Sequence, residues 1–284
     1  MTKSNLILNR LFTQSFVSDI INKNSNPVWT TIVRRFVDDP CDKDNGTIIS
    51  EIYKFMSKSY RNEYFYLNTL LNKLLLGKHN VNTTTALTQI PVGKSKADFI
   101  LINGKAVVYE IKTELDTFDR LHSQLNDYFK AFNHVCVVIP EGYYEKAVSI
   151  LGDSPVGIYT LTPQNTISRK LRKEPIENDS QLDHITMFKV LRKHEYESIL
   201  LKHFQKLPVT SQAFYFDRCL EKFCCIPILE ASKLAVQQLK KRNRIETDYF
   251  DSVPYELKSL LYFHGISEPS WKAINQFLSD KHGG

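Results

Sequence analysis

The sequence is poor in the features that mark several classes of protein. Its five cysteines lack the paired spacing of a zinc site or a disulfide framework, so we expect reduced thiols. Only ten glycines occur among 284 residues, and no internal repeat is visible, which argues against a repeat protein. No apolar run could cross a bilayer, and residues 1–10 lack the apolar stretch of a secretory signal. We therefore expect a cytoplasmic protein without a membrane partner.

The composition that remains is that of a globular protein rich in aromatic residues. Hydrophobic residues make up 42% of the chain and charged residues 24%, with 17 Phe and 14 Tyr. This supply of apolar side chains can bury a full core and argues against disorder. The formal net charge of +6 is compatible with a polyanionic partner such as nucleic acid. A mild excess of Lys and Arg is common, however, so charge alone does not identify the partner.

Apolar periodicity divides the chain into three expected regions. Residues 1–49 carry two amphipathic helical patterns and a polar, turn-rich segment, and we expect an N-terminal helical extension. Residues 50–165 follow the order helix, three strands, helix, strand, helix, strand, which predicts an α/β domain with a mixed sheet flanked by helices. In residues 166–284 only helical patterns remain. We expect an all-helical C-terminal region there that binds substrate or a partner.

Asp98 and Glu110 interrupt the apolar strands expected at 97–102 and 106–111, and Lys112 follows the second strand directly. Carboxylates buried among Val and Ile destabilise a fold unless a cation or hydrogen bonds compensate, so their presence indicates a site. Glu110 and Lys112 are two residues apart on one strand and share a face. The trio is complete only if Asp98 reaches that face as well.

The turn between these strands decides where Asp98 lies. A two-residue turn of Asn103 and Gly104 would place Asp98 opposite Tyr109, on the wrong face. We predict instead a three-residue loop of residues 102–104 with Gly104 in the left-handed conformation, which sets Asp98 opposite Val108. A bulge near Asp98 would serve equally well. Either arrangement brings the two carboxylates together.

Such an arrangement has the donors for a hard divalent cation. Oxygens of Asp98 and Glu110, with the carbonyl of Ile111, would suit Mg²⁺, and we expect Mn²⁺ to substitute for it. Lys112 could then orient or deprotonate the attacking water, or stabilise charge on the phosphorane. The predicted chemistry is hydrolysis of a phosphodiester.

Four sequence blocks in order, residues 61–64, 90–98, 109–116 and 120–128, resemble the PD-(D/E)xK nuclease superfamily, close to a group of uncharacterised bacterial members. The resemblance implies a restriction endonuclease-like fold. Two positions depart from the pattern: Lys96-Ala97 precedes Asp98 in place of the leading Pro, and Gln89 stands where relatives often carry an acidic residue.

The resemblance also implies roles for individual residues. It implies a catalytic group of Asp98, Glu110, Lys112 and Gln124. It implies metal ligation by Glu63, Asp98, Glu110 and Ile111, and substrate binding by Arg61, Lys96, Arg120 and Tyr128. Two simpler interpretations stay open: Glu63 could be a first-turn helix residue favoured by the dipole, and Gln124 an ordinary solvent-facing residue.

The function expected from these features is that of a Mg²⁺-dependent DNA endonuclease, acting in phage defence or in DNA processing. One alternative is a nucleic-acid-binding or scaffolding protein without turnover. Another is an effector nuclease that acts on RNA under the control of a partner. A homo-oligomer or a defence-system partner protein is also open. Basic clusters at 169–173 and 240–244 could contact phosphates or be solvated helix ends.

Overall fold

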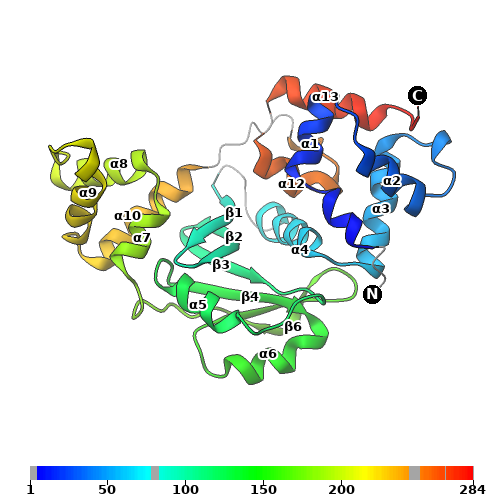
Figure 1. The fold of residues 1–284 in the computed structure, drawn as a ribbon. Helices are drawn as coiled ribbons and strands as arrows, with labels where there is room; N and C mark the ends of the chain where they lie inside the picture. Colours follow the sequence, from blue (N-terminus) through cyan, green and yellow to red (C-terminus); the bar gives the residue numbers. More distant parts are fainter. Residues whose placement is uncertain (1–4, 78–82, 243–249, 266, 284) are drawn as a thin grey trace. The chain divides into compact units, whose positions relative to one another are not determined.

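The computed structural model describes residues 5–77, 83–242, 250–265 and 267–283. The chain divides into two compact units. Figure 1 shows the chain coloured by residue number. Unit 1 comprises Met1–Val81, Pro163–Thr166 and Arg244–Gly284, and unit 2 comprises Asn82–Thr162 and Ile167–Asn243. This grouping differs from three consecutive regions at 1–49, 50–165 and 166–284, because both ends of the chain belong to the same unit.

Unit 2 is built on a six-stranded sheet with the order β1-β2-β3-β4-β5-β6. Its strands are β1 (Thr85–Val92), β2 (Ser95–Asn103), β3 (Lys105–Ile111), β4 (His134–Pro140), β5 (Gly157–Leu161) and β6 (Ile167–Lys173). The pairs β3–β4 and β4–β5 are parallel, and the other three are antiparallel. The two parallel connections contain helices α5 (Leu121–Phe129) and α6 (Tyr144–Leu151), the latter preceded by η4 (Glu141–Tyr143). The expected α/β class with a mixed sheet is confirmed.

The strand β6 is a correction to the expectation that helices alone follow Pro163. Four of its seven residues are basic, so no alternation of apolar and polar residues marks it as a strand. Pairing with β5 satisfies its backbone instead. Arg169 and Lys170 are exposed on this edge strand, where positive charge discourages pairing with a further chain. The basic cluster 169–173 therefore lies on a strand and not at a helix end.

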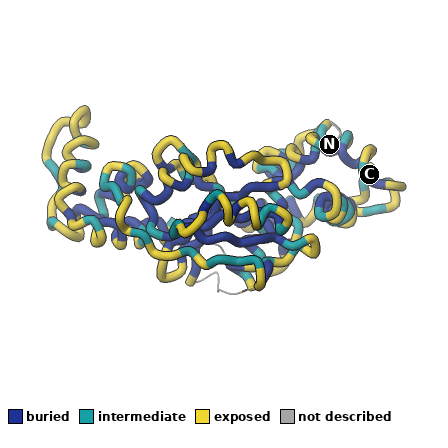
Figure 2. The backbone as a smooth tube through the Cα atoms, turned by 90° about the horizontal axis from the view of Figure 1, so that it is seen from below, coloured by how far each residue is buried: buried dark blue, intermediate teal, exposed yellow. Residues whose placement is uncertain are grey.

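One face of the sheet shares a hydrophobic core with the α-helices of unit 2. Besides α5, η4 and α6, the elements of unit 2 beyond the sheet are α7 (His184–Val190), α8 (Lys193–Phe204), η5 (Gln212–Phe214), α9 (Tyr215–Cys224), α10 (Ile228–Leu239) and η6 (Lys240–Arg242). The short η5 and η6 contribute no residue to the core. The core contains Ile100 and Val108 of the sheet, Leu125 of α5, and Phe188 and Phe223 of the later helices. Figure 2 shows the central strands as buried backbone. The helical patterns expected between 181 and 242 are confirmed, except that 181–205 forms two helices.

Unit 1 is helical in the part of the chain that the structure describes. Its elements are η1 (Asn5–Arg10), α1 (Gln14–Ile21), α2 (Pro27–Phe36), η2 (Pro40–Asp42), α3 (Asn45–Ser59), α4 (Glu63–Leu70), η3 (Leu71–Leu76, a π-helix), η7 (Tyr255–Leu257), α12 (Lys258–His264) and α13 (Glu268–Ser279). Helix α13 packs against α1 and α3, and α12 packs against α4. The buried Asn68 side chain donates to the Tyr255 carbonyl and accepts from the Ser259 N–H, both at 2.9 Å. These contacts join the two ends of the chain.

Within the described segments, no helix combines the length and the apolar character needed to span a membrane.

Candidate active site

The β2–β3 hairpin places Asp98 in a register other than the predicted one, and its pairs keep this register without a bulge. Its pairs run from Phe99 with Tyr109 to Asn103 with Lys105, and Gly104 at the tip has a φ of 74°. The predicted left-handed Gly104 is present, but it is the single residue between β2 and β3, so the predicted three-residue loop of 102–104 is wrong. Asp98 is therefore in register with Glu110 rather than Val108. A shift of two residues keeps the same face of a strand, so the two carboxylates still share a face.

The β2–β3 ladder ends beside Asp98, and the Asp98 side chain takes over the next backbone donor. The last pair is Phe99 with Tyr109, while β2 goes on pairing with β1 and β3 with β4. Beyond it, the Ile111 N–H donates to Oδ2 of Asp98 at 2.9 Å. The N–H and C=O of one strand residue point to the same side, so the Ile111 carbonyl also faces Asp98. The carboxylate of Asp98 and the carbonyl oxygen of Ile111, both possible metal ligands, are thereby directed toward the opening between the strands.

The Glu110 carboxylate is the centre of a buried hydrogen-bond network. The residue is 1% exposed. Oε1 accepts from Lys112 Nζ at 2.9 Å and from Gln124 Nε2 at 2.5 Å, and Oε2 accepts from the Tyr128 hydroxyl at 2.6 Å. A carboxylate has about four acceptor positions, so these bonds leave about one of them for a further ligand.

Lys112 is held by two partners in the same network. Nζ forms a buried ion pair with Glu110 and donates to Gln124 Oε1 at 2.8 Å, while its backbone N–H donates to Val138 on β4. An ammonium group has three donors, so one N–H remains for a substrate or a water. Gln124 is half-buried and bonded to both charged residues, which excludes the simpler interpretation of a solvent-facing helix residue.

Helix α5 supplies both Gln124 and Tyr128, which are one helical turn apart and share a face. The Tyr128 hydroxyl has one hydrogen, which Glu110 and the carbonyl of Lys96 share at 2.6 and 2.9 Å. Burial raises the pKa of Tyr128, and the negative charge of Glu110 raises it further. The hydroxyl therefore stays protonated and acts as a donor to the carboxylate.

Hydrogen bonds to Asp127, the neighbour of Tyr128, join α5 to the turn between β1 and β2. Its Oδ2 accepts from the Lys94 N–H at 3.0 Å and from Ser95 Oγ at 2.8 Å, and Lys130 pairs with Oδ1. Burial alone would raise the pKa of Asp127, but these hydrogen bonds outweigh it and lower the pKa. The strand that carries Asp98 is thereby anchored to the helix that carries Tyr128.

The structure brings together Asp98 from β2, Glu110 from β3, Lys112 directly after β3, and Gln124 and Tyr128 from α5. The other expected site residues are placed differently. Lys96 contributes its backbone carbonyl while the residue is exposed, and Arg120 is exposed at the N-cap of α5.

Arg61 and Glu63 belong to unit 1, whereas the residues of the network belong to unit 2. The Arg61 guanidinium lies over the Tyr66 ring at 5.7 Å, and Glu63 is the exposed first residue of α4. The position of Glu63 matches the simpler interpretation of a first-turn acidic residue. Its expected role as a metal ligand stays a prediction.

Two residues on β1 that lie beside Asp98 were given no role in the sequence analysis: Thr88 was not identified, and Gln89 was named only as a departure from the family pattern. Thr88 Oγ1 donates to the backbone carbonyl of Asp98 at 2.7 Å. Gln89 has a φ of 55°, an uncommon conformation for a residue with a side chain, and it lies between the pairs that flank Asp98. Only the strand register reveals these neighbours, because nothing in the local sequence distinguishes Thr88 from other strand residues.

The donors at the site fit a magnesium ion in their chemistry. The described residues contain no group of three or more His, Cys, Asp and Glu side chains suited to a metal. Magnesium, however, commonly binds through one or two carboxylates and keeps several waters. Asp98, Glu110 and the Ile111 carbonyl supply that number and type of oxygen ligands.

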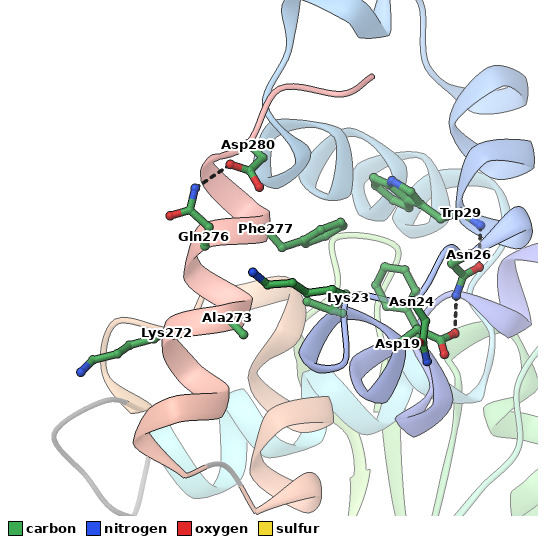
Figure 3. Close-up of a pocket in the computed structure, with 12 residues that line it drawn as sticks. Asp19, Lys23, Asn24, Asn26, Trp29, Lys272, Ala273, Gln276, Phe277 and Asp280 are labelled. Carbon is green, nitrogen blue, oxygen red and sulfur yellow. Dashed lines mark hydrogen bonds between the residues drawn. The ribbon is translucent and has the colours of Figure 1, made fainter. Parts of the chain in front are cut away.

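A pocket of about 580 Å³ lies in unit 1 between α1, α2 and α13 (Figure 3). Phe16 is among the residues that line it. Trp29 and Phe277 contribute apolar rings, and polar side chains such as Asp19 and Lys23 lie around it. None of the expected catalytic residues lines it, and its mixed rim charges single out no class of ligand.

The comparisons with known proteins give one match. A family model described as bacteriophage P4 protein cII matches residues 56–254, which is more than half of the 284 residues. No curated protein and no solved structure matches the chain. The family match covers every residue of the network described above. The chain belongs to the bacteriophage P4 protein cII family.

Proposed function

We propose that this protein is a metal-dependent nuclease of the PD-(D/E)xK type, with a restriction endonuclease-like fold and DNA as its substrate. The observation that carries the proposal is the convergence of Asp98, Glu110 and Lys112 where β2 and β3 part. Glu110 and Lys112 are buried and Asp98 is half-buried where the strand pair ends. Charged groups in such positions are costly for stability, and such costs are characteristic of functional sites.

Each residue has a task in phosphodiester hydrolysis. Asp98, Glu110 and the Ile111 carbonyl would hold Mg²⁺, which neutralises phosphate charge and lowers the pKa of a bound water. The remaining N–H of Lys112 would donate to a phosphate oxygen or orient the attacking water. Because Lys112 is fixed by Glu110 and Gln124, that donor needs little reorganisation during the reaction.

Gln124 and Tyr128 are positioning residues in this proposal. Each donates to a different oxygen of Glu110, so together they fix the rotation of the carboxylate. Precise placement of such a group matters, because a displacement of about 1 Å can cost on the order of a hundredfold in rate.

The family match supports a biological setting for the proposal. The family is named after a bacteriophage protein, which favours processing of the DNA of a mobile element over other settings. RNA is the competing substrate, because the same groups could act on its phosphodiesters.

The test is cleavage of supercoiled, linear and single-stranded DNA, and of RNA, by wild type and variants in Mg²⁺, Mn²⁺ and EDTA. Glu110→Gln keeps the shape of the side chain, and Asp98→Asn keeps an acceptor for the Ile111 N–H. Glu256→Ala is the matched control, because Glu256-Leu257-Lys258 has the same spacing but lies at η7 and α12.

We expect metal-dependent loss of DNA in wild type and in the control. Both site variants should cleave at least a hundredfold more slowly, consistent with loss of charged groups at a reaction centre. Circular dichroism would establish that the variants are folded. A wild type inert on all four substrates with either metal would refute the proposal.

A further inference from the structure

A second pocket, of about 440 Å³, lies within unit 2 at the tip of the β2–β3 hairpin. Lys105 from the hairpin, Lys233 from α10 and Lys240 from η6 contribute to its lining, beside the buried Ser232. Its volume falls in the range of sites for small ligands. Three lysines on one concave surface indicate an anionic ligand.

The charges of this pocket are not neutralised within the described part of unit 2. Lys105, Lys233 and Lys240 form no ion pair or side-chain hydrogen bond with a described residue. One carboxylate, Glu177, lines the pocket and accepts from Asn133 Nδ2 at 2.8 Å. Three ammonium groups against one carboxylate leave an excess of positive charge.

The neighbouring ionisable groups do not reverse that excess. The Asn133 amide also donates to Asp179 at 3.0 Å, which keeps this second carboxylate bonded near the rim. Burial lowers the pKa of His134, and the charge of Lys105 lowers it further, so His134 is neutral at pH 7 and above. The positive potential therefore comes from the lysines alone.

The helices η6 and α10, which carry two of the lysines, are held by hydrogen bonds and an ion pair. Thr85 Oγ1 on β1 donates to the Lys240 carbonyl at 2.6 Å, and Gln238 Nε2 donates to Ser198 Oγ at 3.1 Å. A buried ion pair joins Arg242 of η6 to Glu195 of α8. The backbone that carries these lysines therefore needs little rearrangement when a ligand binds.

We infer that this pocket binds a backbone phosphate of a nucleic-acid strand at a distance from the cleavage site. The inference rests on the proposed function, because it takes nucleic acid as the substrate. Ala106 lines the pocket and, four residues before Glu110, lies on the same face of β3. Five residues of strand, at about 3.3 Å each, separate Lys105 from Glu110 by roughly 17 Å. That length corresponds to about five base pairs of duplex at about 3.4 Å each.

The test is binding of labelled 30-base-pair duplex and single-stranded DNA in EDTA, where no cleavage interferes. The pocket variant is Lys105→Gln, Lys233→Gln and Lys240→Gln together, with Lys233→Gln alone as a milder version. The matched control replaces Lys189, Lys202 and Lys206 by Gln, three exposed lysines of the same unit outside the pocket. Both triple variants lower the net charge equally, so a difference between them reports the location of the charge.

We expect the pocket variant to bind DNA about tenfold more weakly at 100 mM salt. Its plot of log affinity against log salt concentration should become less steep by about 1 to 2, the value for one or two lost phosphate contacts. The control should differ from wild type in neither quantity. Equal binding by the pocket variant and the control would overturn the inference.

Two further arms separate the sources of phosphate and the two proposals. Calorimetric titration with inorganic phosphate and with a mononucleotide tests for a small-molecule site. Saturable binding of either, lost in the pocket variant while DNA affinity is unchanged, would overturn the inference in favour of a free phosphate ligand. If no variant cleaves with any metal but the pocket variant loses DNA binding, the nuclease proposal fails and the phosphate site stands.

Discussion

The hydroxyl of Tyr128 lies 2.6 Å from Oε2 of Glu110 and donates to it, on the side of the carboxylate away from Lys112. Because Lys112 and Gln124 bond to Oε1, the two oxygens of Glu110 are held independently. Rotation of the carboxylate would break bonds on both sides. The hydrogen bonds from α5 thus fix the orientation of the buried Glu110 carboxylate on β3.

Replacing Tyr128 by Phe should lower both stability and activity. The substitution removes the only hydroxyl among these donors and leaves Oε2 of Glu110 with one partner fewer. A lost buried hydrogen bond to a charged group costs about 1.5 to 3 kcal/mol. We expect a lower urea midpoint and a cleavage rate reduced about tenfold or more, measured on the same preparation.

The matched control for that substitution is Tyr159→Phe. Tyr159 is also buried in the sheet, and its hydroxyl donates to Glu174 at 2.7 Å. We expect a comparable loss of stability but unchanged cleavage, because Glu174 belongs to no part of the network. Equal loss of activity in both variants would show that Tyr128 acts through stability alone.

Lys112→Met separates the catalytic role of the ion pair from its structural cost. The variant leaves Glu110 buried without its cation, and breaking a buried pair in this way costs about 3 to 5 kcal/mol. Adding Glu110→Gln removes the orphaned charge, so the double variant should regain much of the stability. We expect cleavage to be absent in both. A double variant as unstable as the single one, by denaturant titration, would contradict this account.

The sequence predicted most of the elements of unit 2 and the members of the network. Alternating and continuous apolar patterns identified five strands, and the charges within them identified Asp98, Glu110 and Lys112. The predicted register of the hairpin was wrong by two residues, because the position of the turn at Gly104 depends on pairing along the whole of β2. Periodicity alone carries no such information.

Three other features could not be predicted from local sequence patterns, because each depends on contacts with distant parts of the chain. Strand β6 is specified by its pairing with β5 and not by its own composition, since four basic residues obscure any alternation. The union of α12 and α13 with the N-terminal helices depends on contacts between residues about 200 positions apart, such as Asn68 with Ser259. The lysine pocket likewise combines the hairpin with a helix more than 100 residues later.

Gly93→Ala should destabilise the anchor between α5 and the β1–β2 turn. Gly93 has a φ of 61°, and an added Cβ would lie 2.7 Å from Asp127 Oδ1. Asp127 cannot easily retreat, because three hydrogen bonds hold its carboxylate. We expect a loss of about 2 to 3 kcal/mol, the sum of left-handed strain and a close contact.

Gly104→Ala is the comparison for that substitution. Its φ of 74° imposes similar backbone strain, but no atom lies within 4 Å of the added Cβ. A loss of only about 1 to 2 kcal/mol is expected from strain alone. The difference between the two variants in denaturant titration measures the contact with Asp127, and equal losses would mean that this contact is relieved at no cost.

His134 should make the stability of the protein depend on pH in mildly acidic solution. Burial first, and then Lys105, hold the pKa of His134 below its usual value of 6.5, while Glu177 and Asp179 oppose the shift. The unfolded chain therefore takes up a proton near pH 6.5 that the folded chain does not. Stability should fall as the pH drops below 6.5, until the folded pKa is reached. The variant His134→Gln should show a smaller decrease between pH 7.5 and 5.5 in thermal unfolding, and an unchanged decrease would assign the effect to other groups.

The buried pair of Arg242 and Glu195 should determine how firmly η6 is held against α8. Arg242 Nε and Nη2 donate to the two oxygens of Glu195, each at 2.7 Å, and Nη2 also donates to the Val190 carbonyl. Burial alone would raise the pKa of Glu195, but hydrogen bonds from Arg242 and the Arg192 N–H lower it. Arg242→Met should therefore cost about 3 to 5 kcal/mol, because it leaves a carboxylate without its cation.

The cost of this substitution should depend on pH. The stability contributed by Glu195 is present above the pKa of the unfolded state and is lost as the pH falls through the lowered pKa of the folded state, so the deficit of the variant should shrink in acid. Chemical unfolding at pH 7 and pH 3.5 would measure this, and a deficit that stays constant with pH would show that packing of the arginine stem, and not its charge, holds η6 in place.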